Sequence, residues 1–169
     1  FNAKHTKMLK DAVNIPVFIG HNIFSPEDAE KMLAEGNADF VALGRSQLAE
    51  PAWAKKAKEG RASDIKPCIN CLIGCIDRGM LSHTPIHCTV NPSLYRFECK
   101  PVEKAETRKQ VAVVGAGPAG CEAALTASKR GHQVTIYEKR CIGGAMIEAS
   151  KPENKANIKR LIHYYEDHI

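Results

Sequence analysis

Four cysteines with unequal spacing are the residues of this chain best suited to chemistry. Cys68, Cys71 and Cys75 form a CxxCxxxC pattern, and Cys88 follows further along. Thiolates spaced in this way can converge on one soft metal centre. Zinc is usually held by two symmetrical CxxC pairs, so the pattern favours a 4Fe–4S cluster, with a structural zinc site as the alternative. Four unligated thiols in a loop-rich segment would be a liability, which makes a chance grouping the weakest interpretation.

A glycine-rich stretch follows the cysteines and has the pattern of a dinucleotide-binding loop. Gly115, Gly117 and Gly120 form GxGxxG between a predicted strand and a predicted helix. The first glycine permits a tight turn, the second lets the backbone approach a pyrophosphate, and the third allows close helix–strand packing. The helix N-terminus offers unpaired N–H groups to the phosphates. Glu138 ends the next strand and is placed to accept a hydrogen bond from the ribose hydroxyls.

Residues around this loop favour FAD over NAD as the dinucleotide. Ala119 extends the glycine pattern, and Gly143 and Gly144 follow soon after Glu138. A metal centre beside a dinucleotide site indicates electron transfer between cofactors.

The remaining cysteines, Cys99, Cys121 and Cys141, are predicted to be packing residues. Cys121 lies inside the helix after the glycines, where a small apolar side chain packs against the sheet. Cys141 has no second cysteine after it, so the redox pair of a disulfide reductase is not predicted.

Two further glycines end predicted strands near the start of the chain. Residues 15–20 and 39–44 read as short buried strands, which end in Gly20-His21-Asn22 and in Gly44-Arg45. In a (β/α)₈ barrel the loops after the last two strands form a phosphate site from backbone amides, and Arg45 would add a charge-assisted contact. The alternative is two ordinary turns with a surface arginine.

The elements that must position these groups form three blocks. In residues 1–62, helices at 7–13, 25–35 and 51–59 alternate with the two strands, which implies that the strands are parallel. Ser25 is the predicted N-cap of the second helix, and Pro26 its first residue. Residues 63–108 have little periodicity and read as loops around a metal. Residues 109–169 open with a strand at 110–114, a helix at 118–130 and a strand at 132–138, a βαβ unit.

Composition excludes several classes of protein. The 169 residues are 44% hydrophobic and 25% charged, which is ordinary for a globular protein. A net charge of +5, with lysines scattered over helices, does not predict nucleic-acid binding. No apolar run is long enough to span a bilayer, and no signal peptide opens the chain. Clustered cysteines favour a reducing cytoplasm. The chain starts at Phe1 inside a helical pattern, so we expect a fragment of a longer polypeptide.

The motifs in order resemble the iron–sulfur flavoenzymes related to old yellow enzyme. The resemblance rests on Gly44-Arg45, on Pro67-Cys-Ile-Asn-Cys-Leu-Ile-Gly-Cys75, on Cys88-Thr-Val-Asn-Pro92, and on Val113-Val-Gly-Ala-Gly-Pro-Ala-Gly120. The group includes 2,4-dienoyl-CoA reductase, 2-enoate reductase, NADH:flavin oxidoreductases and trimethylamine dehydrogenase. It implies an α/β protein with the C-terminal end of an FMN-binding TIM barrel, a 4Fe–4S segment, and the start of a Rossmann-like domain that binds FAD and NAD(P).

The resemblance also implies roles for single residues. The four cysteines would ligate the cluster. The residues around the FMN phosphate would be Gly20, His21, Asn22, Gly44 and Arg45, and those that hold FAD would be Gly115, Gly117, Gly120 and Glu138. Many members have a Gly-Arg pair where His21-Asn22 stand, which weakens the side-chain part of the FMN assignment. The proton donors of the family lie on earlier barrel strands, so no catalytic acid is assigned.

The expected function is reduction of an activated C=C bond in an unsaturated acid or thioester. Electrons would pass from NAD(P)H to FAD, to the cluster, to FMN and to the substrate. One alternative is oxidative amine demethylation within the same family. Another is an electron-transfer module similar to glutamate synthase small subunits, which would have no FMN barrel. A homo-oligomer is possible on this resemblance.

Overall fold

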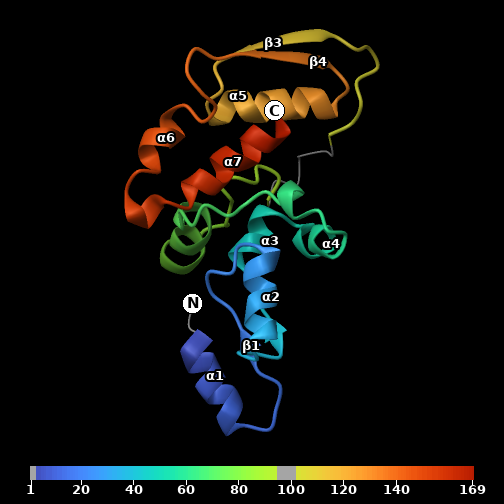
Figure 1. The fold of residues 1–169 in the computed structure, drawn as a ribbon. Coiled ribbons are helices and arrows are strands. Elements are labelled where there is room, and N and C mark those ends of the chain that lie inside the picture. Colours follow the sequence, from blue (N-terminus) through green and yellow to red (C-terminus); the bar gives the residue numbers. More distant parts are fainter. Residues whose placement is uncertain (1–2, 95–101) are drawn as a thin grey trace.

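The computed structural model describes residues 3–94 and 102–169. Cys99, predicted to be a packing residue, lies outside these ranges. Residues 3–19 lie at one end of the molecule and residues 110–137 at the other, and the C-terminal helix lies between the two ends (Figure 1). Among the described residues, no helix is both long and apolar enough to cross a membrane.

The first block, residues 1–62, contains a small parallel sheet with helices packed beside it. In order it holds α1 (Ala3–Ala12), β1 (Phe18–Ile19), α2 (Pro26–Ala34), β2 (Phe40–Val41), α3 (Arg45–Ala49) and α4 (Trp53–Lys58). Phe18 pairs with Phe40 in parallel register, as the alternation of strands and helices predicts. Ile19, Ile23, Met32 and Ala38 form the local core.

Helix α2 begins where the sequence indicates. The Ser25 hydroxyl accepts a hydrogen bond from Asp28 N–H (3.1 Å), and the Asp28 carboxylate accepts one from Ser25 N–H (3.3 Å). This reciprocal capping box, with Pro26 in the first turn, confirms the predicted start.

The prediction that both strands are buried was wrong for the side chains on one face of the sheet. Phe18 and Phe40 are 64% and 49% exposed, and their rings stack with centroids 4.8 Å apart. Because successive side chains on a strand point to opposite faces, Ile19 is buried while its neighbour is not. The described residues cover one face of this sheet only.

The second block is more ordered than predicted. After the 3₁₀ turn η1 (Ala62–Asp64), a π-helix, η2, spans Ile73–Leu81, where loops were expected. Its i→i+5 bonds include Asp77 N–H to Leu72 O (3.0 Å). The helix α3 was also missed, because five residues are too few to show a period.

The third block is the predicted βαβ unit, followed by three further helical segments. Strands β3 (Gln110–Val114) and β4 (Gln133–Tyr137) pair in parallel, and α5 (Pro118–Lys129) crosses between them. The segments α6 (Ala145–Ala149), η3 (Glu153–Lys155) and α7 (Ile158–His168) complete the chain. Cys121 is buried, as predicted, whereas Cys141 is exposed. The packing role predicted for Cys141 was wrong, since it lies in the turn after β4 and not on a packed face.

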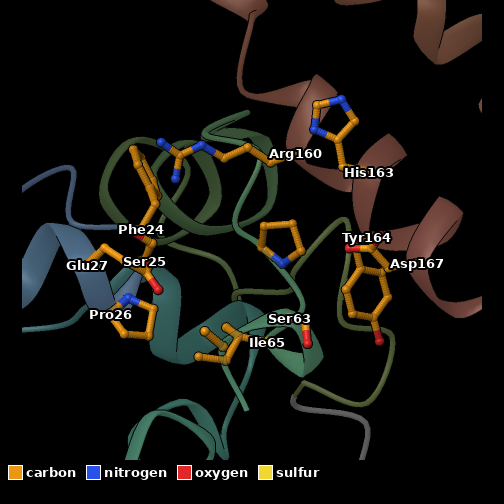
Figure 2. A pocket seen from close by; sticks show the side chains of 12 residues that line it. Phe24, Ser25, Pro26, Glu27, Ser63, Ile65, Arg160, His163, Tyr164 and Asp167 are labelled. Carbon is orange, nitrogen blue, oxygen red and sulfur yellow. The ribbon is translucent and has the colours of Figure 1, made fainter. Parts of the chain in front are cut away.

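Helix α7 joins the third block to the other two. Its residues Leu161 and Tyr165 share a buried core with Ala49, Val90 and Cys121. At the side of this core lies a pocket of about 300 Å³ between α7 and the start of α2, seen in Figure 2. There the Arg160 guanidinium lies 5.0 Å from the ring centre of Phe24. The α-helices and parallel strands make this an α/β protein.

Candidate cofactor site

The structure brings the four motif cysteines together. Cys68, Cys71, Cys75 and Cys88 are all half-buried and line one pocket. None of the described cysteines is in a disulfide, so the four thiols are available as ligands.

Close packing of η2 on the segment before Cys88 forms this pocket. His87 N–H donates to Gly74 O (2.8 Å). A Cβ atom at Gly74 would lie 2.4 Å from His87 O, so no larger residue fits there without movement. This contact places Cys75, the next residue of η2, beside the chain that carries Cys88.

Polar groups surround the sulfur atoms. Asn70 N–H donates to Cys68 Sγ (3.4 Å), and Cys71 Sγ lies 3.2 Å from Thr89 Oγ1. Burial raises the pKa of the Cys68 thiol, while the Asn70 N–H and the positive charge of Arg45 act in the opposite direction. Among the described residues, no three His, Cys, Asp or Glu side chains are grouped closely enough to hold one metal ion.

Arg45 connects the first block to the cysteine pocket, which it also lines. Its guanidinium donates to Asn22 Oδ1 (2.7 Å) and to Asn70 Oδ1. Two residues of the predicted phosphate site, Asn22 and Arg45, are thus brought together. The arginine is half-buried and paired, unlike an ordinary surface arginine.

The backbone near Asn22 has an unusual form. His21 and Asn22 have φ of 73° and 58°, a left-handed conformation that is uncommon in residues other than glycine. A Cβ atom placed at Gly20 would lie 3.4 Å from Ala42 O. A Cβ atom placed at Gly44 would have no other atom within 4 Å. Such strained turns cluster at ligand sites.

The glycine-rich loop has the predicted form. Gly115 has φ of 94°, and a Cβ at Gly120 would lie 1.9 Å from Gly115 O, so α5 can start this close to β3 only with glycine at both positions. No atom lies within 4 Å of a Cβ placed at Gly117, which leaves its backbone open to a ligand. Gly144 packs against Gly117, since a Cβ atom placed at Gly144 would lie 3.0 Å from Gly117 Cα.

Glu138 is held by the backbone of the same loop. It accepts hydrogen bonds from Ala116 N–H (2.8 Å) and Arg140 N–H (2.9 Å). These bonds, with that of Ala116 the strongest, hold the pKa of the carboxyl below its usual value. Glu138 also lines a pocket with Gly115 and the carboxyl ends of β3 and β4, where a nucleotide would lie.

The cysteine pocket and the glycine loop share one core. Ala116 and Cys121 are fully buried and belong to one cluster of core side chains. Cys68 and Cys88 pack against this cluster. Ala119, the remaining predicted residue, is exposed in the first turn of α5 and lines a large apolar groove beside the cysteine segment.

Sequence reasoning missed three residues that lie beside these sites. Asn70 was passed over inside the cysteine motif, although its φ of 55° fits the tolerance of asparagine for the left-handed region. Lys66 and Glu122 form an ion pair between the cysteine segment and α5. They stand far apart in sequence, and no local pattern connects them.

Two family models match the chain. Residues 1–64 match the NADH:flavin oxidoreductase / NADH oxidase family, and residues 109–168 match the pyridine nucleotide-disulphide oxidoreductase family. The chain is similar to the NADH oxidase of Thermoanaerobacter brockii, with 50% identity over 89% of this chain and 24% of that protein.

Two solved structures resemble the whole chain. A 2-naphthoyl-CoA reductase in complex with 2-naphthoyl-CoA has a TM-score of 0.93 and 34% identity over 99% of this chain and 26% of that one. Histamine dehydrogenase from Rhizobium sp. 4-9 has a TM-score of 0.89 and 30% identity over 99% of this chain and 25% of that one.

The chain spans about a quarter of the length of these relatives. The two matched segments follow the chain in the order of the motifs, and the similarity to these relatives extends over most of this chain. Residues 1–64 belong to the NADH:flavin oxidoreductase / NADH oxidase family, and residues 109–168 to the pyridine nucleotide-disulphide oxidoreductase family.

Proposed function

We propose that this chain is the central part of an NAD(P)H-dependent flavin and iron–sulfur oxidoreductase that reduces an activated C=C bond. The observation that supports this most is the position of the four-cysteine pocket. It lies between two nucleotide-binding features, with Arg45 in its wall and the glycine-loop residue Ala116 in the core behind it.

Each block has its own part in this proposal. Residues 1–62 are the last two βα units of an FMN-binding TIM barrel, residues 63–108 the cluster segment and linker, and residues 109–169 the start of a Rossmann-like FAD- and NAD(P)-binding domain. The two family matches, at residues 1–64 and 109–168, support these divisions.

The donor set of the pocket fits a cubane cluster better than zinc. Four thiols are the usual ligands of both. A zinc ion requires all four sulfurs about 2.3 Å from one point. A cubane offers a separate iron to each thiolate, so its ligands stand further apart. The unequal spacing of Cys68, Cys71, Cys75 and Cys88 along the chain, unlike the two symmetrical pairs usual for zinc, favours the cluster.

Together the bound groups would supply a path for electrons from NAD(P)H through FAD, the 4Fe–4S cluster and FMN to the substrate. The chain's own residues bind and orient them. The open backbone at Gly117 would receive the FAD pyrophosphate, and the Glu138 carboxylate the ribose. The backbone of Gly20, His21 and Gly44, with the Asn22 and Arg45 side chains, would hold the FMN phosphate.

The substrate class rests on the relatives. One solved relative is a reductase bound to an aromatic acyl-CoA, which supports an unsaturated acid or thioester as the small-molecule substrate. The likeness to histamine dehydrogenase favours amine oxidation as the second candidate. A module without an FMN barrel, as in glutamate synthase small subunits, is disfavoured by the match of residues 1–64 to a flavin oxidoreductase family.

Iron analysis and one cysteine substitution test the proposal. Full-length protein purified without oxygen should be brown and contain about four irons and four sulfides per chain. In Cys75→Ser the iron should fall sharply, because an alcohol is a poor ligand for iron at neutral pH. FAD should still be reduced by NAD(P)H, while FMN reduction and turnover collapse.

Cys141→Ser is the matched control, since this exposed cysteine lies outside the pocket and should keep all its iron. Stoichiometric zinc in place of iron would refute the cluster. FMN reduction at the wild-type rate without the cluster would refute the path.

A further inference from the structure

A single carboxylate joins the cysteine segment to the glycine-loop helix. Glu122 Oε1 accepts a hydrogen bond from the Tyr165 hydroxyl (2.8 Å) and pairs with the Lys66 ammonium. The Lys66 side chain is only 14% exposed, that of Glu122 34%, and Tyr165 is 2% exposed as a residue. The contact therefore lies mainly inside the protein.

Both ends of this contact lie next to groups of the two proposed redox sites. Lys66 precedes Cys68 by one proline, and Glu122 follows Cys121, whose thiol donates to Ala116 O of the glycine loop (3.3 Å). A shift of the Lys66–Glu122 pair would thus move the cysteine segment relative to the loop.

The surrounding apolar contacts do not fix this arrangement by themselves. Val90, Leu161 and Tyr165 belong to the same buried cluster as the loop residue Ala116, and the apolar attraction between such side chains has no direction. An ion pair with little water around it has a defined geometry, and removal of one partner leaves the other charge uncompensated.

Burial and the bond to Glu122 raise the pKa of Tyr165, which keeps its hydroxyl protonated as a donor. Lys66 is also oriented from its other side. Its ammonium lies 5.9 Å from the ring centre of Tyr164. The ammonium therefore has aromatic and carboxylate neighbours on α7 and α5.

We propose that Glu122 is a positioning residue that fixes the cysteine pocket against the FAD loop and so sets the rate of electron transfer between them. This role rests on the proposed function. Transfer between two centres falls steeply with their separation, and a misplacement of about 1 Å can cost up to about 100-fold in reactions that depend on geometry.

The test is a double-mutant cycle in the full-length, cofactor-loaded protein. Glu122→Gln keeps the size of the side chain and can still accept from Tyr165, and Lys66→Met keeps length without charge. By stopped-flow, each should slow FAD-to-cluster transfer by about tenfold. The double variant should be no slower than the singles, because one interaction has been removed. NAD(P)H-to-FAD hydride transfer, FAD content and iron content should not change.

A second readout does not depend on turnover. Amide hydrogen exchange should speed up in residues 66–72 and 117–124 of either single variant, because the two segments are no longer held together. Glu148→Gln and Lys151→Met, in an exposed ion pair outside this core, serve as controls and should change neither measurement.

Four results would overturn the role. They are an unchanged transfer rate in Glu122→Gln, additive losses in the double variant, loss of iron or FAD from the single variants, and equal slowing of hydride transfer. Wild-type protein without iron would refute the proposed function first, and this role with it, so the two failures can be told apart.

Discussion

The glycine loop and the cysteine pocket are built by different kinds of contact. In the loop, Gly115, Gly120 and Ala116 meet one another within a short stretch of chain. Tyr137, Glu138, Gly143 and Gly144 contact this stretch from further along the chain. The pocket is lined by three separate stretches of chain, residues 45–48, 68–75 and 87–90, and Arg45 reaches a partner 25 positions away.

This difference predicts how the effect of a substitution extends through the structure. Substitution in the loop meets backbone that cannot move, so the local fold should fail before the rest. Substitution around the pocket should shift one wall against another, so metal binding should fail before the fold does. The following predictions test this comparison.

The largest effect is expected at Gly120. In Gly120→Ala the new methyl would lie 1.9 Å from Gly115 O, a backbone atom that cannot rotate away. We expect a loss of about 3 kcal/mol or more in the free energy of unfolding, measured by urea denaturation of the full-length protein.

Gly117→Ala is its control. Nothing lies within 4 Å of the added Cβ, and φ is −73°, so unfolding should change by less than about 0.5 kcal/mol. FAD affinity should still fall, since the methyl blocks the approach of the pyrophosphate. Equal destabilisation by the two variants would contradict a loop fixed by local backbone contacts.

A smaller effect on folding, with a larger one on metal, is expected at Gly74. The methyl of Gly74→Ala would lie 2.4 Å from His87 O and would push η2 away from the chain before Cys88. The cost should be about 1–3 kcal/mol, with a clear fall in iron per chain. In the matched variant Gly79→Ala the methyl meets only the Ile86 Cγ2 methyl, at 2.8 Å. If Gly79→Ala lost as much iron as Gly74→Ala, the contact between Gly74 and His87 would have no special part, and η2 would act as a whole.

Arg45→Lys should have a moderate effect. Lysine keeps the charge but cannot reach Asn22 and Asn70 together, so about 1–2 kcal/mol of binding or folding free energy should be lost. FMN affinity measures the effect of losing the contact with Asn22, and the rate of iron release to a chelator measures the effect of losing the contact with Asn70. Arg61→Lys, on an exposed arginine paired with Glu59 and Asp64, should change neither.

The smallest effect concerns acid stability and the Glu138 carboxyl. Its folded-state pKa is depressed below the ordinary 4.5, so its contribution is present above about pH 4.5 and is lost as pH falls through the folded value. Glu138→Gln should therefore be slightly less stable than the wild type near neutral pH and equal to it in strong acid. Thermal unfolding across this range measures the difference, and a constant gap at every pH would contradict the assignment.

Local rules predicted most of the third block and the entry to α2. The residues of β3 and α5, and the capping box at Ser25, follow from alternation, glycine placement and side-chain caps that act over a few positions. The grouping of the four cysteines was predicted from spacing and chemical type. All four line one pocket, and their role as metal ligands stays a prediction.

The remainder depends on contacts that no short window contains. The π-helix η2 is held from outside, by the packing of Gly74 and Gly79 on residues 86–87, and its period was not recognisable in the sequence. The exposure of Phe18 depends on what covers a sheet face, and that of Cys141 on the turn after β4. The Arg45–Asn70 contact joins two motifs that the sequence presents as unrelated.

The bonds that Glu138 accepts from Ala116 and Arg140 have a consequence for binding kinetics. They hold the glycine loop in one shape through contacts within the chain itself. The conformational entropy of ordering the loop is lost when the chain folds, and association does not have to supply it again. A nucleotide should therefore meet a rigid surface, with an association rate limited by encounter and little rearrangement of the backbone on release.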